Sequence, residues 1–174
     1  MPYELHPEIG PGGIPTSRRF SAVAPLAEGE GLVFHPPSRF RPTRGCHQVA
    51  LLAAHLDAEA AESVHDRLFA AYWDRELDVE DPEVLVDIMT VSSVDPDLVR
   101  ETVTTGALLP AVGTSMMRAA EWGVGGTPAH VVANALHVPG LQEDEFWDRV
   151  VTRIGARSAT PDAPGENPEP GRPE

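Results

Sequence analysis

One stretch decides the fold of this chain: Gly123-Val124-Gly125-Gly126-Thr127-Pro128-Ala129-His130-Val131-Val132. A glycine commonly ends a helix, so Gly123 predicts that a helix stops there. Proline cannot donate to a sheet, so Pro128 suits the first position of a strand, which the β-branched residues after it continue. Only an X-Pro bond takes the cis form at little cost, and we predict that Thr127–Pro128 is cis.

The residues after this stretch predict a second strand and a final helix. Asn134 suits a turn, residues 136–138 suit a strand, and Gly140 suits a break between elements. A helical pattern then covers residues 141–154. The end of the folded chain is therefore predicted to be a unit of two strands and one helix.

The residues before the stretch predict a run of five helices. Two start signals are alike, because Asp81-Pro82 and Asp95-Pro96 each place a capping oxygen before a proline at the first helical position. Thr43 and Asp57 are expected to cap two further helices, and a fifth helix leads into the quoted stretch. Together they predict an all-helical segment over about residues 43–122.

Only short elements are predicted before these helices. The alternating residues Tyr3-Glu4-Leu5-His6 are expected to form a strand, which a Pro/Gly loop ending at Pro15 stops. Residues 16–27 are expected to form a short helix, and residues 32–34 a brief strand or an extended segment.

Composition sets the size and the class of the chain. Its 174 residues, 41% of them hydrophobic, suffice for one domain, which we place at residues 1–157. Residues 158–174 carry no large apolar side chain and are expected to be a disordered Pro/Glu-rich tail. The net charge of −14 argues against a nucleic-acid partner, because phosphate binding uses clustered Lys and Arg. The sequence has no apolar run long enough to span a membrane, and it shows no secretory signal. A cytoplasmic location is therefore expected.

Cys46 is the one cysteine of the chain, so neither an internal disulfide nor a Cys-x-x-Cys motif can form within it. It lies in the first turn of a predicted helix beside His47, and both the helix N-terminus and an imidazolium lower a thiol pKa. Cys46 is therefore either a reactive thiolate with His47 as its neighbour, or a small apolar residue packed under the helix. The histidines lack the spacing of metal ligands, and no metal is expected.

Six short motifs follow one another along the chain: Tyr3-Glu4-Leu5-His6-Pro7-Glu8, Pro42-Thr43 with His47, Leu68-Phe69-Ala70-Ala71-Tyr72-Trp73, Leu77 to Leu85, Trp122 to Pro128, and Gly140-Leu141-Gln142. In this order they resemble the DsbA-like thioredoxin domain family. The match is closest to its FrnE branch, which also takes in 2-hydroxychromene-2-carboxylate isomerases and kappa-class glutathione transferases. The resemblance implies an α/β, thioredoxin-like fold with an all-helical insertion, truncated at its N-terminus relative to the family.

The resemblance also implies a function and a binding site. Family members exchange thiols and disulfides through a Cys-x-x-Cys segment, or carry a serine there in the glutathione-dependent branch. That segment precedes the first motif, so we expect it to be absent and the chain to be inactive as given. The quoted stretch is similar to the family's cis-proline loop, which faces the redox site. At the substrate cleft the resemblance places five residues: Thr43, His47, Gly126, Thr127 and Pro128.

Three functional hypotheses stay open. The first is a protein-disulfide oxidoreductase domain without its catalytic segment, through a late start codon, decay of a paralogue, or completion by a partner strand. The second is a non-enzymatic module that holds an extended peptide or a partner strand at the cis-proline loop. The third is a glutathione-dependent isomerase or transferase. No cofactor is expected, apart from glutathione under the third hypothesis.

Overall fold

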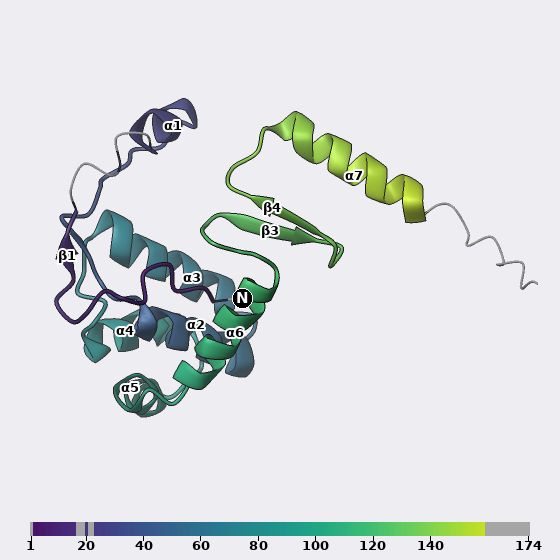
Figure 1. Cartoon of the computed structure of the whole chain (residues 1–174). Helices are drawn as coiled ribbons and strands as arrows, with labels where there is room; N and C mark the ends of the chain where they lie inside the picture. Colours follow the sequence, from purple (N-terminus) through teal and green to yellow (C-terminus); the bar gives the residue numbers. More distant parts are fainter. Residues whose placement is uncertain (1, 17–19, 21–22, 159–174) are drawn as a thin grey trace, which may run out of the picture.

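The computed structural model describes residues 2–16, 20 and 23–158. Helices α2 to α6 form one body, and a β-hairpin with α7 stands beside it (Figure 1). The elements in chain order are β1 (Ile14–Pro15), α1 (Val23–Gly29), β2 (Arg39–Phe40), α2 (Arg44–Leu56), α3 (Ala61–Phe69), a π-helical turn (Ala70–Asp74), α4 (Pro82–Ile88), a 3₁₀ turn (Met89–Val91), α5 (Pro96–Thr105), α6 (Leu109–Glu121), β3 (Ala129–Val132), β4 (Leu136–Pro139) and α7 (Asp144–Ser158).

The core lies among the helices and is centred on α2, which packs against α3, α4, α5 and α6. Apolar side chains at helical spacing meet there, with Val49 of α2, Val64 of α3, Leu85 of α4 and Val99 of α5 fully buried. Burial of such side chains is the dominant favourable term in folding. The helical segment predicted at about residues 43–122 is therefore the part of the chain that carries the core.

Two of the predicted helix starts are confirmed in atomic detail. The Asp81 carboxylate accepts from the Glu83 amide at 2.9 Å, and the Asp95 carboxylate accepts from the Asp97 amide at 2.8 Å. In both helices proline follows the cap, as expected from its missing N–H. The short aspartate–proline pattern is sufficient to start these helices because its hydrogen bonds are local.

The predicted cap at Thr43 is wrong in its hydrogen bonding, whereas the Asp57 carboxylate does accept from the amide three residues later, as a capping residue does. Thr43 occupies the position before α2, but its hydroxyl lies 3.2 Å from His47 Nε2 instead of accepting from the backbone. Helix α3 begins after Ala60, later than Asp57 implied. The Asp57 carboxylate accepts from the Ala60 amide at 3.2 Å, and it also accepts from the amide and hydroxyl of Ser93 at 2.8 and 2.9 Å. It thereby ties the α2–α3 connection to the loop before α5.

The predicted strand at residues 3–6 does not form. Strand structure needs a neighbouring strand for its backbone groups, and none of the described strands pairs with this segment. The segment instead crosses toward α6, where the Glu4 amide donates to Met116 Sδ at 3.1 Å. The first described strand is β1, inside the predicted loop, and it pairs antiparallel with β2. Residues 32–34 form no strand.

The first and the last helix have other limits than predicted: α1 begins later, and α7 ends later. The predicted helix at residues 16–27 corresponds in part to α1, which begins at Val23, while positions 17–19, 21 and 22 lie outside the described residues. Helix α7 runs to Ser158, so this residue belongs to a helix and not to a tail. The disorder predicted for the rest of the tail falls outside the described residues. Among the described helices, none is long and apolar enough to cross a bilayer.

The quoted stretch behaves as predicted. Helix α6 ends at Glu121, and Gly123 then takes φ +71°, a value that favours glycine. The amides of Gly123 and Val124 donate to the carbonyls of Ala120 and Ala119, both at 2.9 Å, which is the paired hydrogen bonding of a Schellman end. The Thr127–Pro128 bond is cis, and β3 and β4 follow as an antiparallel hairpin.

Candidate substrate-binding site

The loop between α6 and β3 forms one wall of a hollow of about 370 Å³. The hairpin supplies the other wall, and the two are joined by a 2.8 Å hydrogen bond from the Gly140 amide to the Pro128 carbonyl. The lining consists of Gly123, Gly125, Gly126, Thr127, Pro128, His137, Pro139 and Gly140. Three of the five residues predicted for the substrate cleft therefore line one hollow.

The register of the hairpin determines which face the hollow uses. Val131 lies opposite His137 and Ala129 lies opposite Pro139, so these four side chains share one face. The other face carries His130, whose ring meets Trp147 of α7 edge to face at 4.8 Å between centroids. Helix α7 therefore covers one face of the hairpin, and the hollow opens on the opposite face.

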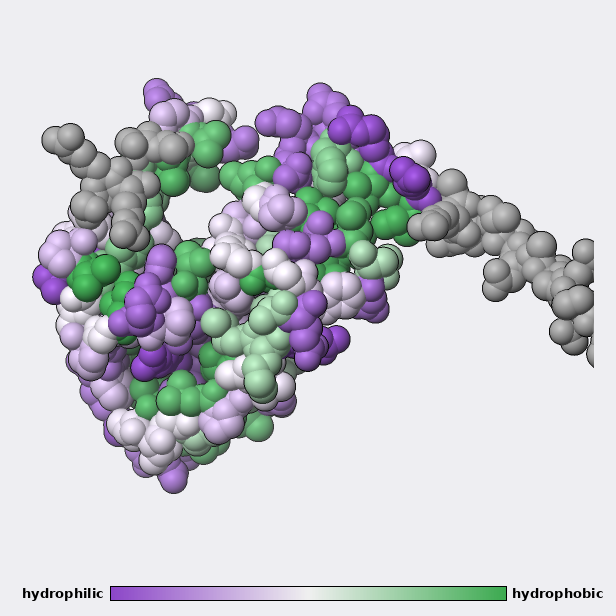
Figure 2. Space-filling view, viewed as in Figure 1, coloured by the Kyte–Doolittle hydropathy of each residue, from purple (hydrophilic) through white to green (hydrophobic). Residues whose placement is uncertain are grey.

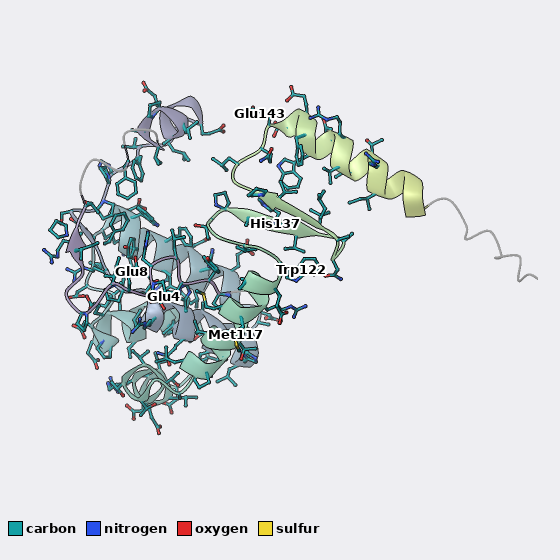
Figure 3. The ribbon with its side chains drawn as sticks, in the orientation of Figure 1. Glu4, Glu8, Met117, Trp122, His137 and Glu143 are labelled. Atoms are coloured by element: carbon teal, nitrogen blue, oxygen red, sulfur yellow. The ribbon has the colours of Figure 1, made fainter. Side chains whose placement is uncertain are left out.

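The space-filling view agrees with this division (Figure 2). Hydrophilic residues cover the outer side of α7, and apolar residues gather between α7 and the hairpin. In the view with side chains, His137 is on β4 of the hairpin, which lies between α7 and the end of α6 at Trp122 (Figure 3).

The hollow is uncharged and rich in exposed main chain. None of its lining residues is Asp, Glu, Lys or Arg, and four of the eight are glycine. A Cβ placed on Gly125 or Gly126 would meet no atom within 4 Å, so open space lies next to the loop backbone. Such a surface suits a ligand that approaches a main chain closely, as an extended polypeptide does.

The other two residues predicted for the cleft lie elsewhere. Thr43 and His47 are hydrogen-bonded to each other at the start of α2, and neither lines the hollow. Burial lowers the pKa of the His47 imidazole, and the nearby Glu4 carboxylate opposes that change in part. Glu4 is itself buried and accepts from Arg44 Nε at 3.1 and 3.3 Å. His47 thus belongs to a polar cluster under the N-terminal segment, and a role for it or for Thr43 in binding stays a prediction.

Cys46 is a core residue. Its side chain is 8% exposed and belongs to the apolar cluster around α2. Burial raises the pKa of its thiol to about 12, although a hydrogen bond with the backbone acts in the opposite direction. Burial and the raised pKa support the other interpretation of Cys46, a small apolar residue packed under the helix, and a reactive thiolate stays a prediction. The position at the helix start does not lower the pKa here because the thiol points into the core.

The structure adds one residue that the sequence pattern did not single out. His137 lines the hollow, and its Nε2 is the buried side-chain nitrogen that lacks a hydrogen-bond partner among the described residues. The signal for it was present in the sequence, because His137 stands two residues before Pro139 and strand residues at that spacing share a face. The spacing of metal ligands, for which the histidines were considered, does not indicate that His137 lines a hollow. In the described part of the chain, no three His, Cys, Asp or Glu side chains come close enough to hold a metal ion.

Comparison with known proteins gives the class of the molecule. The family model of the DSBA-like thioredoxin domain matches residues 2–151, and the chain therefore belongs to the DSBA-like thioredoxin domain family. The fold is the α/β thioredoxin-like fold with a helical insertion that the motifs predicted.

A similar solved structure is the "probable DsbA oxidoreductase" of Streptomyces coelicolor. It superposes with a TM-score of 0.74 at 22% identity, over 88% of this chain and 73% of that one. At this identity the likeness shows the fold. No curated protein matches the chain.

Proposed function

We propose that this chain is a DsbA-family, oxidoreductase-like domain that binds extended polypeptides in the hollow at Thr127–Pro128 and does not itself exchange disulfides. The observation that carries the proposal is the pairing of an open, uncharged hollow at that loop with a buried, protonated Cys46. The chain has one cysteine, and disulfide exchange begins with attack by a thiolate. The chain thus provides a binding surface at the hollow without a reactive thiolate beside it.

The assignment within the family rests on the motifs. We place the chain in the FrnE branch on its six collinear motifs, and a cytoplasmic location remains the prediction from the sequence. The glutathione-dependent alternative fits less well, because glutathione is anionic and no Lys or Arg lines the hollow.

Substitution of Gly126 by leucine is expected to weaken polypeptide binding at least tenfold. The new side chain enters open space beside the loop, where an added Cβ meets nothing within 4 Å, and so fills the hollow without displacing the chain. The measurement is fluorescence anisotropy with fluorescein-labelled insulin B chain, reduced and carboxamidomethylated so that it is extended and free of thiols.

The matched control is Gly113→Leu. Gly113 is exposed on α6, and its added Cβ also meets nothing within 4 Å, so the same substitution is made outside the hollow. Equal affinity of the two variants would show that the polypeptide binds elsewhere. Glutathione added in the same titration tests the alternative, because it competes with the labelled chain if it occupies the hollow.

The chain is also expected not to accelerate reduction of insulin by dithiothreitol. With the Cys46 pKa at about 12, less than about one thiol in a thousand is ionised at pH 8. The turbidity of released B chain measures the rate, and Cys46→Ser should give the same trace as the unchanged chain. A rate above the uncatalysed one that disappears in Cys46→Ser would make Cys46 a nucleophile and overturn the proposal.

A further inference from the structure

His137 is the polar side chain that β4 contributes to the lining of the hollow. The lining contains two polar side chains, Thr127 and His137, and the rest is glycine and proline. Thr127 stands in the loop, whereas His137 lies across the hollow on β4. A ligand placed between the two walls therefore meets the imidazole on the side away from the loop.

The imidazole carries an unused hydrogen-bonding group. Its Nε2 is buried and has no partner among the described residues. Buried polar groups in proteins are almost always paired, and an unpaired one marks a site where a partner is expected. The imidazole lines the hollow, and a half-turn of the ring about Cβ–Cγ exchanges the positions of Nε2 and Cε1.

The surroundings restrict the kind of partner. No cation lines the hollow, and the chain has a net charge of −14, so an anionic ligand is disfavoured. The open backbone at Gly125 and Gly126 admits a neutral, extended main chain. A peptide carbonyl is the neutral acceptor that such a chain supplies at every residue.

We propose that His137 is a specificity-determining residue of the hollow, donating a hydrogen bond from Nε2 to a main-chain carbonyl of the bound polypeptide. The inference rests on the polypeptide-binding function proposed above. It adds a contact from β4 to the binding surface of the loop, and it makes affinity depend on one side chain of the hairpin.

The first test compares three variants of the full chain with the same labelled B chain. His137→Phe keeps a planar ring but loses the nitrogen and should raise the Kd roughly three- to tenfold, the worth of one hydrogen bond. His137→Gln keeps an N–H near the position of Nε2 and should stay within about twofold of the unchanged chain. His130→Phe makes the same ring substitution on the face covered by α7 and should leave the Kd unchanged.

The second test needs no variant to fold. In the full chain labelled with ¹⁵N-histidine, addition of the B chain should shift the side-chain nitrogen signal of His137 and leave that of His130 in place. An unshifted His137 signal, or equal Kd values for His137→Phe and His130→Phe, overturns the inference. If Gly126→Leu still weakens binding at least tenfold in that case, the proposed function stands and only the role of His137 fails. If the unchanged chain does not bind the probe, both fail together.

Discussion

Cys46 is expected to react with iodoacetamide at pH 8 about a thousandfold more slowly in the native chain than in the chain unfolded in guanidinium chloride. The reagent attacks the thiolate. A thiol with a pKa of about 12 supplies about a thousandth of the thiolate that a thiol with the ordinary value of 9.0 supplies at this pH. The low exposure of the side chain slows the reaction further. Mass spectrometry of quenched samples measures both rates.

The direction of the pKa change also predicts how stability depends on pH. Because the folded pKa lies above the unfolded one, the stability that the buried thiol contributes is complete below about pH 9 and falls as pH rises toward 12.

A Cys46→Ser, Gly113→Cys double variant is the control for the iodoacetamide reaction, because it moves the thiol to the exposed face of α6. It should react at nearly the same rate folded and unfolded. Fast labelling of native Cys46 would contradict its place in the core.

Replacement of Leu85 by alanine is expected to lower the free energy of unfolding by about 2–5 kcal/mol, the range for buried leucines that leave a cavity. Leu85 is fully buried at the centre of the helical body. Its Cδ1 lies only 2.7 Å from where a Cβ on Gly45 would stand, so α2 presents bare backbone to this side chain. Loss of the side chain beyond Cβ is therefore expected to leave a cavity beside the backbone of α2.

Urea unfolding followed by circular dichroism measures this difference, with the slope of the transition expected to stay constant. Leu141→Ala is the matched control, because Leu141 is 73% exposed and the same atoms are removed without leaving a cavity. Its effect should stay within about 0.5 kcal/mol. A loss below about 1 kcal/mol for Leu85→Ala would show that the helical body is not a tightly packed core.

The candidate site was only partly predictable from the sequence. Gly126, Thr127 and Pro128 are consecutive, so the chain itself brings them to one loop, and the hollow contains all three. Thr43 and His47 are far from them in sequence, and their place depends on how α2 packs. The position of His137 depends on the register of β3 and β4, which pairs it with Val131. On that face of the hairpin it lines the same hollow as the loop.

By itself the sequence determined those elements whose stabilising contacts lie within a few residues. Hydrogen bonds between residues close in sequence form three such features: the aspartate–proline caps at Asp81 and Asp95, the helix end at Gly123, and the hairpin after Pro128. Features that need a distant partner were decided by the tertiary structure alone. Residues 3–6 have the pattern of a strand, but they pair with no described strand and lie against α6 instead. Cys46 has the position of a reactive thiol, yet the packing of four helices around α2 buries it and keeps it protonated.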